Sequence, residues 1–362
     1  MNEAPAATAR HRTPRSREGE VFAALDLGTN NCRLLVATPA GHGFRIVDSY
    51  SRIVRLGEGL SQNGRLSDGA MERAMSALSI CADKIARRGA NHVRAVATQA
   101  CRTASNGAQF LAQVEASTGL RLSVISPREE ARLAVAGCLD LIDHTAKTVL
   151  ILDVGGGSTE LSWLDLRAGD LERHPGRRAY WRPPIAAWLS MPVGVVSLTE
   201  RFPHGEADDL AGFRAMVEAV KAELARYLGA EPLRQLFMDG QTHLIGTSGA
   251  ITSLAGLHLG LARYDRSRVD GLWMTRDACE AVARRLAGLS VAERGAQPCI
   301  GPDRADLVLA GAAILQAVQE LWPCQRVRVA DRGLREGLLL SLMAQRRRHR
   351  RRPARTPAGP AT

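Results

Sequence analysis

One short pattern occurs twice in this chain of 362 residues and limits the folds that it can adopt. An apolar run ends at Asp26 in the sequence Asp-Leu-Gly-Thr-Asn, and another ends at Asp153 in Asp-Val-Gly-Gly-Gly. In both copies a second run with strand character follows the glycine turn. The copies lie 127 positions apart, which is about the length of one domain. The spacing predicts a duplicated fold, with one copy in each of two lobes and a cleft between them.

Strands and helices alternate along both halves of the sequence, which indicates an α/β fold. The length favours two domains rather than one. Residues 172–188 fit neither the helical nor the strand period, and we expect an inserted loop there. The predicted division is a disordered arm over 1–19, a first domain over 20–133, a second over 134–340 and a basic, proline-rich tail over 341–362.

The composition excludes several classes of protein. No apolar run approaches the roughly 18 to 20 residues that a membrane span needs. The arginine-containing start has no apolar segment behind it and does not resemble a secretory signal. The seven cysteines never occur in C-x-x-C spacing, which argues against a zinc site and a disulfide framework. We therefore expect a cytoplasmic protein with no membrane partner.

The formal net charge of +11 predicts polyanionic partners. Much of this charge lies at the ends, and the arginine-rich tail is also explained by a solvated terminus without a partner. A protein that binds nucleic acid through the tail is one alternative. Aromatic residues make up only 4% of the chain, which argues against stacking on single strands and disfavours nucleic acid.

The second glycine turn contains three consecutive glycines, Gly155, Gly156 and Gly157. A turn between two strands usually needs one glycine or Asn-Gly, so three favour a turn whose backbone something approaches closely. Successive amides can form an anion-binding nest, to which Ser158 and Thr159 add hydroxyl donors. The turn predicts a phosphate site, and a loose hairpin bend is the simpler alternative. No P-loop motif and no dinucleotide-binding glycine motif occurs.

Two carboxylates flank this turn, Asp153 at the end of the first strand and Glu160 on the second. Mg²⁺ takes oxygen ligands and is often held by one or two carboxylates together with substrate oxygens. The pair is therefore a candidate Mg²⁺ site. Glu160 is equally compatible with an ordinary solvent-facing strand residue.

A second pair of carboxylates opens the helix predicted after Ser126. Ser126 and Glu129 have the spacing of a capping box, with Pro127 at the first helical position. Glu129 is thus assigned a structural role. Glu130 has no such local role, and it is our candidate for a general base that takes a proton from an attacking water. The alternative is one more exposed helical glutamate.

Two further segments carry candidate phosphate ligands. Arg102 follows a predicted strand in a turn of small residues, and a guanidinium can bind phosphate oxygens bidentately. Gly246, Ser248 and Gly249 lie at a predicted strand-to-helix turn, where a helix N-terminus can hold an anion. A surface arginine and a plain tight turn explain these segments equally well.

Seven segments together resemble the exopolyphosphatase and guanosine pentaphosphate phosphohydrolase family, a branch of the actin, sugar kinase and Hsp70 ATPase superfold. The match runs from about Val21 to Leu340. The segments are LDLGTNN, ATQACRTASN, EEARLAVAG, LDVGGGSTEL, MPVGVVSLTE, GTSGAITSLA and ADRGLREGLL. The chain ends soon after the last segment, so it resembles the short, two-domain members of the family.

The resemblance implies two ribonuclease-H-like lobes with the active site between them. It implies that Glu130 is the catalytic base, that Asp153 and Glu160 hold Mg²⁺, and that Arg102 binds phosphate. It also implies phosphate-binding loops at both glycine turns. The first loop reads Gly28, Thr29, Asn30 and Asn31, where many relatives carry serines beside the asparagine.

The activity that the resemblance implies is metal-dependent release of orthophosphate from the end of inorganic polyphosphate. Hydrolysis of guanosine pentaphosphate is the close alternative, because both substrates end in a phosphoanhydride and no motif separates them. The positive charge favours the longer polyanion. An ATP-binding sensor or chaperone-like module of the same superfold is an alternative of another class, against which the combination of Glu130 with Asp153 and Glu160 argues. A homodimer is an expectation from the family alone.

Overall fold

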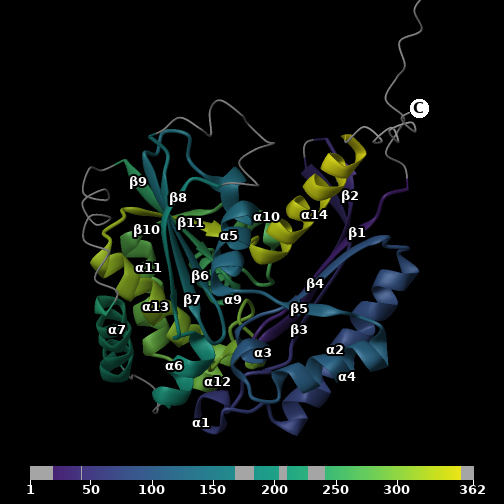
Figure 1. Cartoon of the computed structure of the whole chain (residues 1–362). Coiled ribbons are helices and arrows are strands. Elements are labelled where there is room, and N and C mark those ends of the chain that lie inside the picture. The colour runs from purple at the N-terminus through teal and green to yellow at the C-terminus, as the bar shows by residue number, and fades with distance from the viewer. Residues whose placement is uncertain (1–18, 42, 168–182, 204–209, 227–240, 352–362) are drawn as a thin grey trace, which may run out of the picture.

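Each copy of the repeated pattern opens one mixed β-sheet (Figure 1). The computed structural model describes residues 19–41, 43–167, 183–203, 210–226 and 241–351. The first sheet has the order β3-β2-β1-β4-β5. Its strands are β1 (Phe22–Leu27), β2 (Asn31–Ala40), β3 (Gly43–Ile53), β4 (His92–Ala97) and β5 (Leu122–Val124). β1 to β3 form an antiparallel meander, and β4 and β5 extend the sheet in parallel.

The second sheet repeats this order as β8-β7-β6-β9-β11, with β10 added at the edge. Its strands are β6 (Thr148–Val154), β7 (Thr159–Asp165), β8 (Ile185–Met191), β9 (Thr242–Thr247), β10 (Trp273–Thr275) and β11 (Arg326–Ala330). β6 to β8 are antiparallel, and β9 and β11 join in parallel. The identical strand order and directions confirm the predicted duplicated α/β fold.

The prediction of an inserted loop over 172–188 is wrong at its end, because β8 begins at Ile185. β8 is an edge strand of the sheet, and most of its side chains are only partly covered. Both of its faces therefore tolerate mixed residues, which hides the alternation that marks a half-buried strand. Residues 172–182 lie outside the described residues.

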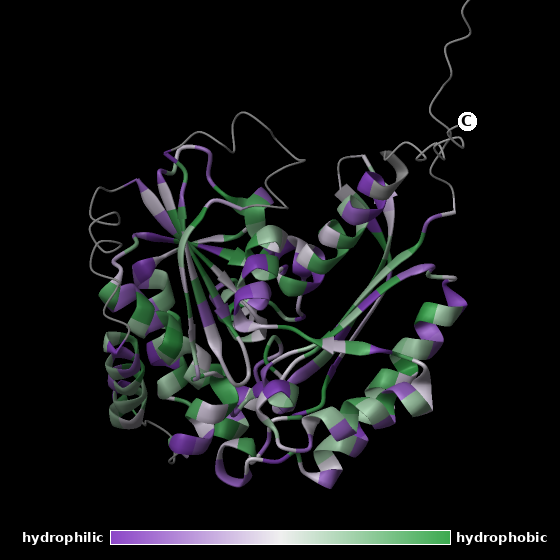
Figure 2. Ribbon diagram, in the orientation of Figure 1, coloured by the Kyte–Doolittle hydropathy of each residue, from purple (hydrophilic) through white to green (hydrophobic). Residues whose placement is uncertain are grey.

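Longer helices cover the outer face of each sheet. α2 (Asp68–Arg87) and α4 (Gly107–Thr118) share one apolar cluster with the first sheet. α7 (Leu210–Ala225), α9 (Gly249–His258), α11 (Arg276–Ala287) and α13 (Val308–Leu321) share another with the second. Figure 2 shows apolar residues along the strands and mixed polar and apolar residues on these helices.

Short helices connect the longer elements. They are α1 (Leu60–Asn63), α3 (Gln99–Thr103), α6 (Val195–Arg201), α10 (Arg266–Val269) and α12 (Val291–Gly295), with 3-10 turns at Leu139–Leu141 and Pro302–Arg304. In the described part of the chain, we find no helix with the length and apolar character of a bilayer span.

Two helices, α5 (Pro127–Cys138) and α14 (Leu334–Arg351), lie between the two sheets (Figure 1). Leu133 of α5 packs with Leu338 and Leu339 of α14 in a cluster with the first sheet. Val135 and Cys138, also of α5, belong to a cluster with the second sheet. One helix thus contributes to the cores of both lobes.

The predicted domain boundaries fall inside these two helices. The boundary at 133/134 divides α5, and the boundary at 340/341 divides α14. The prediction that the basic tail starts at 341 is wrong, because Met343 of α14 is buried against the first sheet. The tail prediction rested on arginine content, which hid the apolar face of this helix. Residues 1–18 and 352–362 lie outside the described residues.

Glycines allow α5 and α14 to approach closely. A Cβ atom at Gly337 would lie 2.0 Å from the carbonyl oxygen of Leu133, and one at Gly137 would lie 2.0 Å from that of Gly333. Both obstacles are backbone atoms, so no side-chain rotation can relieve the overlap. The spacing of the two helices, and with it the junction of the lobes, depends on these glycines.

Replacing Gly337 by Ala should lower the free energy of unfolding by about 1–3 kcal/mol, because the helices must separate to admit the methyl group. Denaturant-induced unfolding followed by circular dichroism measures the change. Gly69→Ala in α2 is the matched control, because a Cβ there meets only Arg73 Nη1, at 3.6 Å. The control should be neutral or slightly stabilising. A Gly337→Ala variant as stable as wild type would contradict the close approach.

Candidate active site

The two glycine turns of the repeat meet between the lobes. We name residues 28–31, which connect β1 to β2 and include the first residue of β2, hairpin loop 1. Residues 155–158, between β6 and β7, are hairpin loop 2. In hairpin loop 1 the amide of Gly28 donates to the Asn31 carbonyl over 2.8 Å. In hairpin loop 2 the amide of Gly155 donates to the Ser158 carbonyl over 2.9 Å. The two turns are therefore closed by equivalent hydrogen bonds.

The glycines of hairpin loop 2 leave no space for side chains. A Cβ at Gly156 would lie 3.0 Å from the amide nitrogen of Asn30, and one at Gly157 would lie 3.2 Å from Thr29 Oγ1. A Cβ at Gly157 would also overlap the side chain of Gln99. The glycine triplet thus allows the backbone of the opposite lobe to approach, a reason that the sequence alone did not reveal.

A cavity of about 130 Å³ lies where the two hairpin loops meet. Thirteen of the sixteen residues that the sequence singled out line it. They are Gly28, Thr29, Asn30, Asn31, Glu130, Asp153, Gly155, Gly156, Gly157, Ser158, Glu160, Ser248 and Gly249. Segments far apart in the sequence are therefore brought to one place, as the duplicated fold predicts.

Three predicted residues do not line this cavity. Arg102 lies behind Glu130: its Nη1 is 3.3 Å from Glu130 Oε2 and donates to the Ile125 carbonyl over 2.7 Å. Thr159 is fully buried, and its hydroxyl donates to the Val193 carbonyl over 2.7 Å. Gly246 lies inside β9 between Leu152 and Val329. The turn we expected at Gly246 begins two residues later, where α9 starts after Ser248.

Six acidic residues line the cavity, and four of them, Asp26, Glu130, Asp153 and Glu160, form what we name the carboxylate cluster; the other two are Asp331 and Glu336. Burial raises the pKa of Asp26 to about 6, and burial together with the charge of Asp26 raises the pKa of Asp153 to about 6. Burial, then the charge of Glu160, raises the pKa of Glu130 well above its ordinary range, although Arg102 opposes the rise. Burial, then the charge of Asp153, also raises the pKa of Glu160. Each carboxylate therefore resists ionisation in the absence of a cation.

The two neighbouring glutamates of α5 have different surroundings, as predicted. Glu129 is half-exposed, and its amide donates to the hydroxyl oxygen of the capping residue Ser126 over 3.2 Å. Its carboxylate forms an ion pair with Arg94. The second half of the predicted capping box is thus wrong, because a charge-assisted bond to a guanidinium is stronger than one to a backbone amide. Glu130 is buried and lines the cavity.

The oxygen atoms of this cluster suit a hard cation. Asp26 Oδ1 and Asn30 Oδ1 are buried without a hydrogen-bond partner. Glu160 Oε1 accepts from the hydroxyls of Ser158 and Ser190, each over 2.8 Å, which fixes its orientation. Among the described residues no three His, Cys, Asp or Glu side chains form a complete metal-binding group. Mg²⁺ commonly binds one or two carboxylates together with substrate oxygens, and the residues present fit that arrangement.

The sequence analysis missed several residues of the cavity. Asp26 is the repeat partner of Asp153, and the repeat itself was the signal that could have identified it. Arg33, Arg304 and Arg335 come from three different elements and also line the cavity. A Cβ at Gly249 would lie 3.5 Å from Arg33 Nη2 and 3.9 Å from Arg304 Cζ. Guanidinium groups therefore lie beside the start of α9, opposite in charge to the carboxylate cluster.

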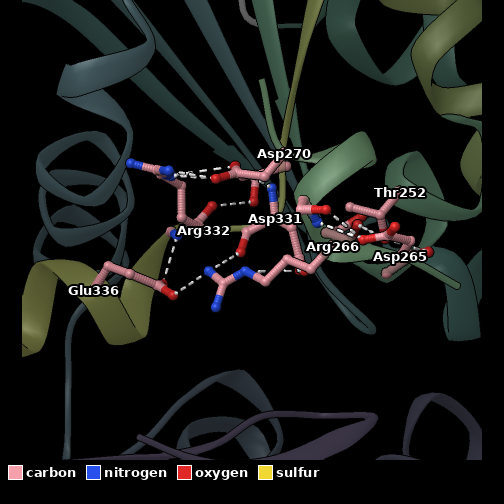
Figure 3. A network of polar contacts seen from close by, with 12 residues as sticks. Thr252, Asp265, Arg266, Asp270, Asp331, Arg332 and Glu336 are labelled. Carbon is pink, nitrogen blue, oxygen red and sulfur yellow. Dashed lines mark hydrogen bonds and ion pairs between the residues drawn. The ribbon is translucent and has the colours of Figure 1, made fainter. Parts of the chain in front are cut away.

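An ion-pair network holds the segment after β11 that forms another wall of the cavity (Figure 3). Arg332 forms an ion pair with Asp270. Arg266 contacts Asp331 at 3.3 Å and Glu336 at 3.1 Å. Glu336 Oε2 in turn accepts from the amide of Gly333 over 2.9 Å, at the start of α14. The network therefore holds this segment both at Asp331 and Arg332, directly after β11, and at Glu336, at the start of α14.

A comparison with family models identifies the family of this chain. The model described as the Ppx/GppA phosphatase family matches residues 35–346. The chain belongs to this family. Exopolyphosphatase 2 of Mycobacterium tuberculosis is 30% identical over 88% of this chain and 98% of that protein. Guanosine-5'-triphosphate,3'-diphosphate pyrophosphatase of Aeromonas hydrophila is 28% identical over 89% of this chain and 59% of that protein.

A solved structure agrees with this family assignment. The Aquifex aeolicus PPX-GPPA enzyme superimposes with a TM-score of 0.70 at 27% identity, over 89% of this chain and 99% of that one. The shared fold therefore extends over nearly all of the described part of the chain.

Replacing Glu130 by Gln should stabilise the metal-free protein at alkaline pH. A carboxylate whose pKa is raised on folding stabilises the protein below its unfolded pKa, and this contribution is lost as the pH rises through the folded pKa. The stability gain of Glu130→Gln over wild type should thus be small at pH 5 and reach about 1–2 kcal/mol by pH 8. Denaturant unfolding with a chelator present measures it.

Glu129→Gln is the matched control, because Glu129 lies outside the carboxylate cluster. It should show no gain that grows with pH. A Glu130→Gln variant that is less stable than wild type at pH 8 would contradict the unfavourable burial of this charge.

Proposed function

We propose that this chain is an exopolyphosphatase, which hydrolyses the terminal phosphoanhydride of inorganic polyphosphate and releases orthophosphate. Activity of the exopolyphosphatase or guanosine-pentaphosphatase type follows from its family and from its two named relatives. The observation that carries the site assignment is the meeting of two glycine loops and four carboxylates in one cavity. The relative that matches over 98% of its own length bears the name exopolyphosphatase, and the net charge of +11 favours a long polyanion.

In this proposal the hairpin loops bind the terminal phosphoryl group. The amides of Gly28 and Gly155 close the turns themselves, so Gly156, Gly157 and the residues after Gly28 remain as candidate donors. Amides fixed in position stabilise the charge that develops on the phosphoryl oxygens without having to reorganise. Arg102, which lies behind Glu130 and outside the cavity lining, contributes positive charge from a distance.

Glu130 is the proposed general base. Its carboxylate takes a proton from the attacking water when it is ionised, and Arg102 at 3.3 Å favours the ionised form. Its raised pKa makes it a stronger base than an ordinary glutamate. Asp153 and Glu160 would hold Mg²⁺, with Asp26 as a further oxygen ligand. A cation bound there would neutralise charge on the substrate oxygens and lower the pKa of the surrounding carboxylates.

Phosphate release from polyphosphate and from guanosine pentaphosphate, with one preparation, tests the proposed function. We expect Mg²⁺-dependent release from polyphosphate with the higher kcat/KM, and loss of activity with a chelator. A higher kcat/KM on guanosine pentaphosphate would support the close alternative instead. Nucleotide binding without phosphate release from either substrate would support the sensor or chaperone-like module.

Glu130→Gln should reduce kcat on polyphosphate by at least about 100-fold, because general-base catalysis contributes roughly 10²–10⁴ in rate. The midpoint of thermal unfolding should be at least that of wild type. Glu129→Gln, one residue away, is the control and should keep kcat within about threefold. Turnover like that of wild type in Glu130→Gln would refute the base assignment.

A further inference from the structure

Two polar contacts join the lobes beside the hairpin loops. The first is made by Arg55, which follows β3. Its Nη1 donates to Asp306 Oδ2 over 2.8 Å and its Nη2 donates to Asp306 Oδ1 over 3.0 Å. Nη2 also contacts the Asp303 carbonyl at 3.1 Å. A bidentate pair of this kind fixes both distance and orientation.

The second contact runs in the opposite direction, from the second lobe to the first. Glu200 lies on α6, and its Oε1 accepts from the amide of Gly59 over 2.8 Å. Its Oε2 accepts from the Ser61 hydroxyl over 2.6 Å. We name these five residues the clasp: Arg55 and Asp306, with Glu200, Gly59 and Ser61.

The first-lobe side of the clasp is bonded directly to hairpin loop 1. The Asn30 carbonyl accepts from the amides of Val54 and Arg55 over 2.9 and 3.1 Å. The amide of Gly57 donates to the Thr29 carbonyl over 2.9 Å. A Cβ at Gly57 would lie only 2.2 Å from Thr29 Cγ2, so the two segments are in tight contact. Any displacement of Arg55 therefore acts on hairpin loop 1.

The second-lobe side is bonded to hairpin loop 2 in the same way. The amides of Val195 and Val196, which begin α6, donate to the carbonyls of Gly155 and Gly156 over 3.0 and 2.7 Å. A Cβ at Gly194 would lie 2.5 Å from the Gly156 backbone. Glu200 is on this same short helix. The Thr199 hydroxyl also donates to the Asp306 carbonyl over 3.3 Å, which links the two contacts of the clasp.

Arg55 holds a backbone conformation that costs free energy. Its φ is +47°, in the left-handed region that residues other than glycine rarely adopt. Arg73 supports it: Nε donates to the Val54 carbonyl over 2.9 Å, and Nη2 contacts Glu58 at 2.6 Å. Such strain persists where surrounding contacts hold it, and here those contacts aim a guanidinium at the other lobe.

We propose that the clasp sets the separation of the two hairpin loops and so positions the phosphate-binding groups for the reaction. Hairpin loop 1 is hydrogen-bonded to residues 54–57, and hairpin loop 2 is hydrogen-bonded to the start of α6. The clasp joins these two segments across the lobes, so a continuous series of hydrogen bonds connects one loop to the other. Breaking the clasp removes this constraint on the loops without changing the identity of any cavity residue. Its members are positioning residues, because they act through the hairpin loops.

Spin labels report the separation of the lobes without any substrate. All seven cysteines are buried, so Cys introduced for the exposed Glu72 on α2 and Ala292 on α12 can be labelled selectively. The distance distribution by double electron–electron resonance should be narrow in wild type. It should become longer and broader in Arg55→Ala and in Glu200→Ala. The exchanged pair Arg55→Asp with Asp306→Arg should restore the narrow distribution, since aspartate tolerates the left-handed region.

Kinetics on polyphosphate give a second readout, which rests on the proposed function. If only a fraction of molecules holds the loops at the binding distance, the apparent affinity falls by that fraction. We expect KM to rise about threefold to tenfold in Arg55→Ala, with kcat within about twofold because the bound state is unchanged. Arg214→Ala is the matched control. It breaks an ion pair with Glu320 inside the second lobe, and it should change neither KM nor the distance distribution.

The proposal fails if Arg55→Ala leaves the distance distribution unchanged, or if the exchanged pair does not restore it. It also fails if KM stays constant while the lobes separate. If the wild-type protein hydrolyses neither substrate, the proposed function fails. The distance measurements then still support or overturn the role of the clasp in lobe separation.

Discussion

The contact between two backbone turns, one from each lobe, is the constraint on which this structure depends. Gly156 lies so close to the Asn30 amide that a Cβ atom there would be only 3.0 Å from its nitrogen, so the neighbouring loop would have to shift to admit a methyl group. Three features described above support this contact. They are the close approach of α5 and α14 at their glycines, the ion pairs of the segment after β11, and the hydrogen bonds of the clasp. The proposed phosphate site needs such rigid supports, because small displacements of the binding groups weaken their positioning strongly.

The cavity is lined by charged side chains of both signs. Four carboxylates gather where β1, β6, β7 and α5 meet, and arginines from β2, from the 3-10 turn before α13 and from α14 line the same cavity. Like charges buried close together repel one another, so the ionised carboxylates, and likewise the arginines, destabilise the folded protein when no opposite charge is near. A polyanion together with a cation neutralises both. In the proposed function, this arrangement would make the site complementary to a metal-bound phosphate, at a cost to the stability of the free protein.

The sequence predicted those features that depend on local pattern. The duplicated fold could be inferred from the repeat, and the surroundings of Glu129 and Glu130 could be distinguished from the position of Ser126. The sequence predictions failed for residues whose surroundings are determined by contacts with distant parts of the chain. Thr159 follows a glycine loop, but its hydroxyl donates to the Val193 carbonyl instead of lining the cavity. Arg33 lies on a strand, and nothing in the neighbouring sequence indicates that it lines the cavity. β8 lacked clear alternation because it is an edge strand.

The sharing of α5 and α14 between the lobes has a consequence for synthesis on the ribosome. The inner face of the first sheet is covered by Leu338, Leu339 and Met343, which lie about three hundred residues after Ala40, the end of β2. The amino-terminal lobe therefore cannot complete its interior until the last helix has emerged. A nascent chain of this protein carries a partly uncovered apolar sheet throughout most of translation, which is the kind of surface that chaperones bind.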